Sequence, residues 1–371
     1  MELDGGRLER AFGVVEHFVQ EGSIPGAVIL VGTPRDVHGP RAYGWASLQP
    51  MRRPMQEETL FDLASLTKVV ATAALAWQLL DQGRIRLDDP VSLFLPGYGA
   101  HDRGPSREWK EQLTLRHLLT HTSGISGWEP LYRHPGSPAD RLQQLLRYPL
   151  LQPPGERVVY SCLGYILLGW ILEVVAGAPL DQLARERLYQ PLGMEATGFV
   201  PAPDLRERAA ATELAPDTGE VLQGVVHDEN ARFLGGVAGN AGLFGTARDL
   251  AAFALEVLKA LRGEPALWSP AVVRLATRSL TPGKEEERGL GWQIHGGRPF
   301  SSAGDLFSPA SFGHTGFTGT SLWIDPEREL FAVLLTNRVH PSRDNQAHLR
   351  LRPLFHNAVA AAAVGGGAAT G

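Results

Sequence analysis

The sequence predicts an α/β (α+β) fold in which helices flank an antiparallel sheet and a mostly helical domain is inserted between the strands. Apolar runs typical of strands lie near both ends of the chain, at 27–31, 41–48, 290–295, 321–324 and 330–336. Between them, apolar residues recur at helical spacing between Pro- and Gly-rich loops, with no convincing pair of strands. We therefore expect a sheet domain from residues 1–64 and 263–371, and a helical domain from residues 65–262.

The first elements follow from local patterns. Residues 7–21 carry apolar side chains every three or four positions, which predicts a helix. The run 27–31 predicts a strand, and 41–48 is expected to pair with it across a turn that contains Gly and Pro. A long pattern rich in Ala, Leu and Val then predicts a helix over 65–82, which Gly83 closes.

The middle of the chain contains five further helical patterns, at 114–121, 139–147, 163–175, 181–189 and 247–261. The strand-like segments return after residue 263, and a last helix is expected from about residue 345 to residue 363. The tail 365–371 consists of small residues with little to anchor it, so we expect it to be disordered.

Composition excludes several classes of protein. A net charge of −5 gives no basic footprint, so nucleic acid is not expected as a partner. Cys162 is the single cysteine, which rules out an internal disulfide, and the acidic N-terminus lacks the pattern of a secretion signal. The longest apolar run, 163–172, is too short to span a bilayer. We therefore expect a cytoplasmic protein that has no membrane partner.

Lysine is scarce, because only four of the 35 basic residues are lysines. Arginine can carry surface charge and form ion pairs but cannot act as a base, so a lysine in an apolar segment is of chemical interest. Lys68 is in such a segment, three residues after Ser65, and both side chains would share one helix face. Apolar neighbours and the helix dipole are expected to lower the pKa of Lys68 and make it a usable base. The alternative is that Ser65 caps the helix and Lys68 extends to solvent.

Two further segments contain candidate catalytic groups. Tyr160 lies where a Pro- and Gly-rich turn meets an apolar helix, so its phenol either relays a proton to a leaving group or is an ordinary residue at the core edge. The glycine-punctuated segment 312–319 predicts an edge strand whose free main-chain N–H near Phe317 could bind an oxyanion. Its alternative is a twisted edge with a surface histidine, His314.

Other histidines are weaker candidates. His117 and His121 are spaced to share a metal on one helix, but no third ligand is evident, so we favour structural hydrogen bonds. The run 227–230 combines His, Asp, Glu and Asn in an irregular segment, and we expect it to line a cleft rather than bind a metal. No metal and no cofactor are expected.

Three motifs in this order resemble the serine beta-lactamase and penicillin-binding protein superfamily, in its class C lactamase-like esterase and peptidase branch. They are Ser65-x-x-Lys68, Tyr160-Ser-x and His314-Thr315-Gly316. Segments 115–124 and 191–194 are also similar to that family, so the resemblance covers nearly the whole chain. Segments 227–244 and 312–326 look most like cell-wall N-acetylmuramoyl-L-alanine amidases, which remove peptide from N-acetylmuramic acid.

The resemblance implies a beta-lactamase/transpeptidase-like fold with its active site in the cleft between the sheet and the helical domain. It implies a serine hydrolase that forms an acyl-enzyme with a small-molecule ester, amide or muropeptide-like substrate, which includes cell-wall fragments. By the same resemblance, Ser65 is the nucleophile, Lys68 helps to deprotonate it, and Tyr160 is a second base that later protonates the leaving group. The N–H groups of Ser65 and Phe317 form the oxyanion hole, and the remaining substrate-binding residues are His314, Thr315, Gly316 and Cys162.

Three positions bear on the substrate. His314 replaces the lysine with which many lactamases favour anionic substrates, and it is largely uncharged at neutral pH. Cys162 replaces an Asn or an acidic residue, and Asn240 replaces a His. Two alternatives therefore stay open beside the ester or amide hydrolase. One is a beta-lactamase or D-Ala-D-Ala carboxypeptidase, and the other is a catalytically degenerate sensor that binds wall fragments.

Overall fold

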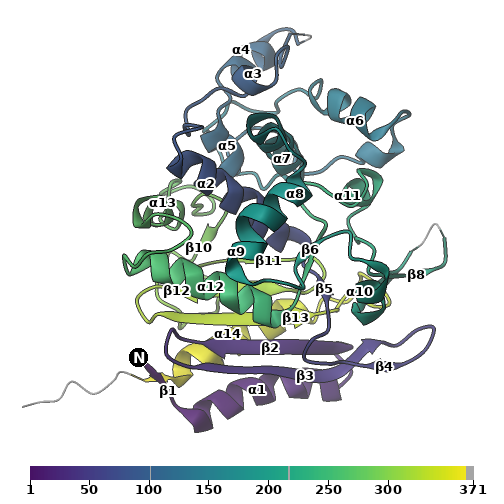
Figure 1. Ribbon diagram of the computed structural model, residues 1–371, viewed down its shortest axis with the longest axis vertical. Helices are drawn as coiled ribbons and strands as arrows, with labels where there is room; N and C mark the ends of the chain where they lie inside the picture. The colour runs from purple at the N-terminus through teal and green to yellow at the C-terminus, as the bar shows by residue number, and fades with distance from the viewer. Residues whose placement is uncertain (101, 216–217, 365–371) are drawn as a thin grey trace, which may run out of the picture.

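A computed structural model describes residues 1–100, 102–215 and 218–364. Its largest sheet has seven strands, all antiparallel, in the order β10-β11-β12-β13-β2-β3-β4. The strands are β2 (Gly26–Gly32), β3 (Val37–Ser47), β4 (Arg53–Pro54), β10 (Gln293–Ile294), β11 (Phe312–Thr315), β12 (Ser321–Asp325) and β13 (Leu330–Thr336). The predicted fold class is confirmed, since both ends of the chain contribute to one sheet (Figure 1).

Strands β2 and β13 pair at the centre of this sheet and are buried along their whole length. Side chains alternate between the two faces, because successive strand residues point in opposite directions. Ile29 and Leu334 pack against α1 (Gly5–Gln20) and α14 (His348–Ala362), whereas Leu30 and Val333 belong to the core on the other face. Helix α12 (Ala247–Leu261) covers β2 and β13 on that second face.

The helical layer lies above the sheet in Figure 1 and centres on α7 (Cys162–Ala176). This helix is apolar nearly all round and is buried for that reason. Ser161 caps its first turn, and Gly177 ends it in the left-handed conformation, with φ 75°. The other helices are α2 (Ala74–Asp81), α3 (Val91–Phe94), α4 (Pro105–Glu111), α5 (Leu115–Leu119), α6 (Pro138–Leu145), α8 (Leu180–Ala184), α9 (Gln190–Leu192), α10 (Pro203–Arg208), α11 (Glu229–Phe233) and α13 (Pro270–Ala276).

The prediction of no strand pairs between residues 65 and 262 is wrong. Strand β9 (Leu243–Gly245) joins β5 (Phe61–Asp62) to β6 (Gly198–Phe199), and β7 (Ala211–Leu214) pairs with β8 (Val221–Gln223). These strands have two to four residues each, too few to show alternation in the sequence. The strand predicted at 290–295 is present only as the two residues of β10. A last pair, β1 (Glu2–Leu3) with β14 (Ala363–Val364), brings the two ends of the described chain together.

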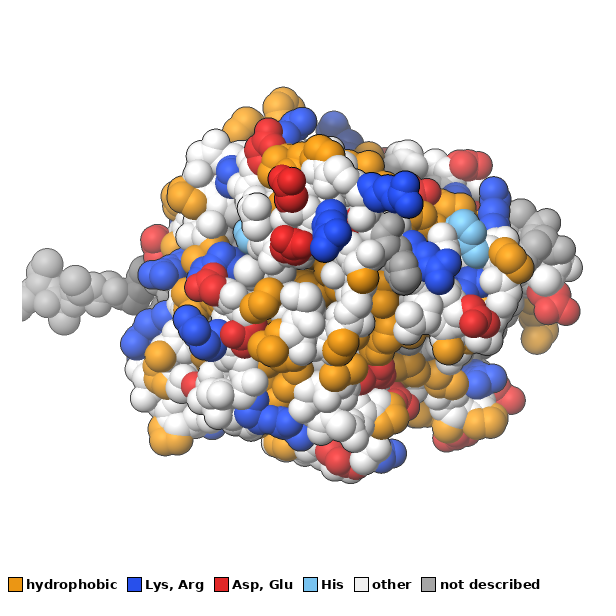
Figure 2. Space-filling model, turned by 90° about the horizontal axis from the view of Figure 1, so that it is seen from above, with side chains coloured by type: hydrophobic (Ala, Val, Ile, Leu, Met, Phe, Trp, Pro, Cys, Tyr) orange, Lys and Arg blue, Asp and Glu red, His pale blue; other side chains and the backbone are white. Residues whose placement is uncertain are grey.

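The predicted domain boundaries stay a prediction, and α12, although inside the predicted helical segment, packs on the sheet. The tail 365–371 lies outside the described residues. Among the described helices, none alone is long and apolar enough to cross a membrane, and the bent pair of α7 with Leu180–Leu192 meets that test only together, by length and composition. On the face seen in Figure 2, acidic and basic side chains are interspersed.

Candidate active site

Ser65 and Lys68 lie one turn apart just after strand β5. Ser65 is in a 3₁₀ turn (Ala64–Leu66), and Lys68 begins a stretch of π-helix (Lys68–Ala73) that leads into α2, so the helix predicted over 65–82 is composite. Nζ of Lys68 is 3.0 Å from Oγ of Ser65, and Lys68 is 0% exposed. The residue that caps this turn is Leu63, not Ser65. The alternative of a capping serine and a solvent-exposed lysine is therefore wrong.

Two more groups contact the Lys68 amine. Nζ donates to the backbone carbonyl of Asn240 at 2.9 Å and is 3.5 Å from Sγ of Cys162. Burial lowers the pKa of Lys68, as expected, but the electrostatic effects of Cys162 and Tyr160 outweigh burial and raise this pKa above its ordinary value. The expectation of a lowered pKa is therefore wrong, because the sequence does not show which side chains surround the amine.

Tyr160 lies against the same amine, with its ring centroid 4.9 Å from Nζ of Lys68. Its hydroxyl is buried and has no hydrogen-bond partner among the described residues. Burial raises the pKa of Tyr160, while the positive charge of Lys68 acts in the opposite direction. The charge state of each of these two groups therefore affects the ionisation of the other. Since Tyr160 and Ser65 also line the same cavities, Tyr160 is not an ordinary core-edge residue.

Strand β11 and the turn after it form the other wall of the site. All four residues of β11 pair with β12 on one side. Phe312 and Gly313 also pair with β10 on the other side, so the edge-strand prediction is wrong for these two residues. His314 is buried, so the alternative of a surface histidine is also wrong. Burial, followed by the charges of Arg288 and Lys68, holds the pKa of His314 well below its usual range. The imidazole is uncharged at neutral pH, as expected.

The turn from Gly316 to Thr320 is anchored beside Ser65. Thr318 and Thr320 donate hydrogen bonds to the carbonyls of Asp62 and Leu63, at 2.7 and 3.1 Å. A Cβ at Gly316 would lie 2.0 Å from Oγ1 of Thr320, so only glycine fits this close approach. The backbone N–H groups of Ser65 and Phe317 make no hydrogen bond within the described chain. Both are therefore available to an oxyanion, in the arrangement that the resemblance implies.

A cavity of about 390 Å³ opens beside Ser65, and its lining includes more arginines than carboxylates, with Glu286 as the carboxylate. Arg288, Arg338 and Arg352 line it together with His314 and Tyr160. Arg288 is paired with Glu286, but Arg338 and Arg352 form no ion pair with any described residue. The sequence analysis assigned no role to Arg288 or Arg352, because nothing in the local pattern indicates which arginines of an arginine-rich chain turn inward.

A second cavity, of about 370 Å³, lies on the other side of Ser65 and Phe317 and also contains Cys162. His227, Asp228 and Glu229 line it, which confirms the predicted cleft lining for these three residues, whereas Asn230 is fully buried and does not line this cavity. Beyond it is a groove of about 1080 Å³ that shares Trp128, Glu229 and Arg343 with this cavity. The cleft is therefore long enough for substituents on both sides of Ser65.

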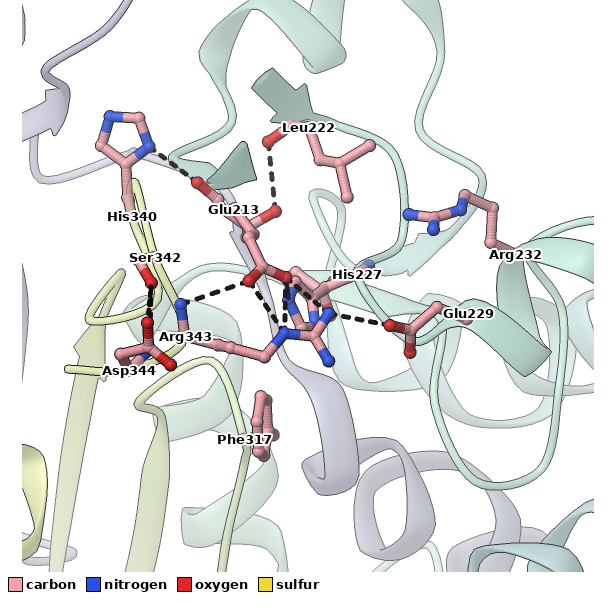
Figure 3. A network of polar contacts seen from close by, with 12 residues as sticks. Glu213, Leu222, His227, Glu229, Arg232, Phe317, His340, Ser342, Arg343 and Asp344 are labelled. Carbon is pink, nitrogen blue, oxygen red and sulfur yellow. Dashed lines mark hydrogen bonds and ion pairs between the residues drawn. The ribbon is translucent and has the colours of Figure 1, made fainter. Parts of the chain in front are cut away.

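A buried charge cluster supports the ring of Phe317 (Figure 3). Glu213 receives a hydrogen bond or ion-pair contact from Nε2 of His227, at 2.9 Å, and from Nε of Arg343, at 2.7 and 2.8 Å. The guanidinium of Arg343 also contacts Glu229, at 2.7 Å. The ring of His227 stacks on Phe317 with centroids 5.6 Å apart. The cluster thus joins His227 and Glu229 to Glu213 and Arg343, which lie in separate segments of the sequence.

Hydrogen bonds account for the two helix-spaced histidines, as favoured. Nδ1 of His117 accepts from the backbone N–H of Thr114, at 3.1 Å, and closes the first turn of α5. Nδ1 of His121 accepts from the backbone N–H of Ser161, at 3.0 Å, and its ring packs against that of Tyr160 at a tilt of 36°, with centroids 4.4 Å apart. His121 thereby helps to hold Tyr160 in place.

A serine hydroxyl next to a buried lysine amine, with a buried phenol and two available N–H groups around the same cavity, is the arrangement of a serine hydrolase. The Beta-lactamase family model matches residues 12–356, and the chain belongs to that family.

Two kinds of relatives agree with this assignment. The chain is 35% identical over 316 residues to an Escherichia coli K12 protein named "Putative D-alanyl-D-alanine carboxypeptidase", covering 78% of this chain and 71% of the relative. Among solved structures, EstCE1, described as a hydrolase with promiscuous acyltransferase activity, is 25% identical with a TM-score of 0.74 and coverage of 95% and 99%. Simvastatin synthase from Aspergillus terreus, 22% identical with a TM-score of 0.73 and coverage of 96% and 98%, shares the fold.

Proposed function

We propose that the enzyme hydrolyses an amide or ester through an acyl group on Ser65. The observation that carries this proposal is the distance of 3.0 Å between Oγ of Ser65 and Nζ of the fully buried Lys68. As Oγ attacks the substrate carbonyl carbon, its proton passes to the Lys68 and Tyr160 pair in the fraction of the enzyme in which one of the two is deprotonated, and the N–H groups of Ser65 and Phe317 stabilise the oxyanion. Tyr160 then protonates the leaving nitrogen or oxygen. Water, deprotonated by the same pair, releases the acyl group.

The charge of the cleft supports a substrate whose leaving group carries a carboxylate. Arg288, Arg338 and Arg352 line the cavity beside Ser65, so a carboxylate there would be attracted although His314 is neutral. The neutral His314 therefore does not argue against an anionic substrate, because the arginines supply the positive charge that this histidine lacks. Amides that end in a free carboxylate, including peptide fragments of the cell wall, fit this chemistry.

Labelling tests the nucleophile and its base. Intact-mass spectrometry after incubation with a fluorophosphonate is expected to show one adduct, absent in Ser65→Ala and formed about 100-fold more slowly in Lys68→Arg. Lys259→Arg, at a half-exposed position on α12, is the matched control and should label like the parent. Labelling of Lys68→Arg at the parent rate would contradict the role of Lys68.

A second candidate function is D-alanyl-D-alanine carboxypeptidase, favoured by the arginine-lined cavity and by the names of the curated relatives. Release of D-alanine from a peptide ending in D-Ala-D-Ala, compared with hydrolysis of a neutral ester and of a chromogenic cephalosporin, separates carboxypeptidase, esterase and lactamase. A wall-fragment sensor would bind the peptide without turning over any of the three.

We also propose that the protein is cytoplasmic. Fractionation of the cells that produce it, followed by detection of the protein in each fraction, tests this location.

A further inference from the structure

Two buried arginines donate hydrogen bonds to the backbone carbonyls of Gly316 and Phe317. The carbonyl of Gly316, which belongs to the same peptide unit as that N–H, accepts a hydrogen bond from a terminal nitrogen of Arg352 at 2.6 Å. The same nitrogen donates to the carbonyl of Thr320 at 2.8 Å, and Nε of Arg338 donates to the carbonyl of Phe317 at 2.8 Å. Within the described chain, the N–H of Phe317 has no partner.

Arg352 comes from α14, 36 residues after Gly316, and is only 5% exposed. It forms no ion pair with a described residue, and burial lowers its pKa to about 9, which leaves it charged at neutral pH. A buried charge without a counterion is costly, so its hydrogen bonds to carbonyls must compensate. Those bonds are concentrated on the turn that carries the oxyanion donor.

A cation that binds a peptide carbonyl polarises the whole peptide unit. Withdrawal of electron density through the C=O makes the N–H of the same unit a stronger donor, and the two bonds from one guanidinium fix its direction. We propose that Arg352 is a positioning residue that orients and polarises the Gly316–Phe317 peptide unit, so that the N–H of Phe317 stabilises the oxyanion. This inference rests on the proposed function.

The competing role for Arg352 is direct recognition of a substrate carboxylate, because Arg352 also lines the charged cavity. The two roles differ in what they change. Polarisation of the oxyanion donor acts on the transition state of every substrate and changes kcat. Recognition of a carboxylate acts on one class of substrate and changes KM.

The experiment uses two esters with the same acyl group, one with a neutral leaving group and one whose leaving group carries a carboxylate. In Arg352→Met and Arg352→Lys we expect kcat to fall by the same factor on both esters, roughly 10-fold for Met and less for Lys, with little change in KM for the neutral ester. This is below the 10²–10³-fold cost of removing a direct oxyanion donor. The affinity for a boronic acid, whose adduct places an oxygen in the oxyanion hole, should fall in proportion. Arg350→Met, at an exposed position on the same helix, is the control.

Loss confined to the carboxylate ester, or parent kcat in both variants, would overturn the proposal. If Arg352→Met does not fold, as judged by thermal unfolding, Arg352→Lys alone decides, since it keeps a cation and one donor. Failure of the parent enzyme to label at Ser65 would instead refute the proposed function, so the two failures are distinguishable.

Discussion

Cys162 is one of the side chains that affect the pKa of Lys68, the proposed base. Its Sγ lies 3.5 Å from Nζ of Lys68, and its electrostatic effect on the amine opposes that of burial. The family that the sequence resembles has Asn or an acidic residue here. The structure places Cys162 against Lys68 rather than in a remote part of the cleft, so this departure bears on the base and not only on the substrate.

Cys162→Ala and Cys162→Asp are expected to shift the pH dependence of kcat/KM in opposite directions. Alanine removes the effect that raises the pKa of Lys68, so the ascending limb moves to lower pH. Aspartate adds a negative charge, raises that pKa further and moves the limb to higher pH, with kcat/KM at pH 7 roughly 10-fold lower. Initial rates on a neutral ester, extended above pH 10.5 because the pKa of Lys68 is raised above that ordinary value, locate the ascending limb of the parent and of each variant. Superimposable profiles for the parent and the two variants would exclude Cys162 from the proton network.

At the scale of elements, long patterns were predictable and short ones were not. Helix α12 and strand β13 occupy the residues 247–261 and 330–336 that their periodicity predicts. The π-helix after Ser65 was not predictable, because its sequence is as apolar as an ordinary helix. Neither was the anchoring of the turn at Gly316, since its partners near residue 63 are about 250 positions away in the chain.

Gly316→Ala is expected to abolish most of the activity through this turn. The new Cβ would lie 2.0 Å from Oγ1 of Thr320 and 2.5 Å from the carbonyl of Leu63, so the turn must shift and carry the N–H of Phe317 with it. We expect fluorophosphonate labelling of Ser65 to slow about 100-fold and stability to fall by about 1–3 kcal/mol.

Gly13→Ala is the matched control for this substitution. Gly13 lies inside α1, where an added Cβ meets no atom within 4 Å, so alanine should raise stability by about 0.5–1 kcal/mol and leave labelling unchanged. Parent-rate labelling by a folded Gly316→Ala variant would show that the turn does not position the oxyanion donor.

At the scale of the whole molecule, sequence motifs indicate the candidate reacting groups but not the groups that contact them. Ser65, Lys68, Tyr160 and Phe317 follow from local patterns and their order. The supporting charges do not, because Glu213 and Arg343 are 130 residues apart and meet only when β7 packs against the segment after β13. Such contacts leave no periodic signal in a single sequence. Arginine suits this position better than lysine, because its planar guanidinium can contact two carboxylates at once, here Glu213 and Glu229.

The same ion cluster predicts how stability depends on pH. Burial alone would raise the pKa of Glu213, but the hydrogen bonds and charges of His227 and Arg343 lower it to about 2. Since the ordinary value is 4.5, the folded state binds the proton less tightly than the unfolded chain. The cluster therefore stabilises the fold fully above about pH 4.5, and this contribution is lost as the pH falls toward 2.

Glu213→Gln should accordingly lower the free energy of unfolding at pH 7, by about 1–3 kcal/mol because solvent partly screens the half-exposed Arg343, and this deficit should shrink between pH 4.5 and pH 2. Urea unfolding of the parent and the variant at pH 7, 5, 4 and 3 measures it. Glu285→Gln is the control, because the pKa of Glu285 is also lowered to about 2, by Arg157 and backbone N–H groups, yet this carboxylate is exposed to solvent. Solvent screens such a pair, so Glu285→Gln should change stability little at any pH. An equal deficit at pH 7 and pH 3 for Glu213→Gln would show that the ionisation of Glu213 does not contribute to stability.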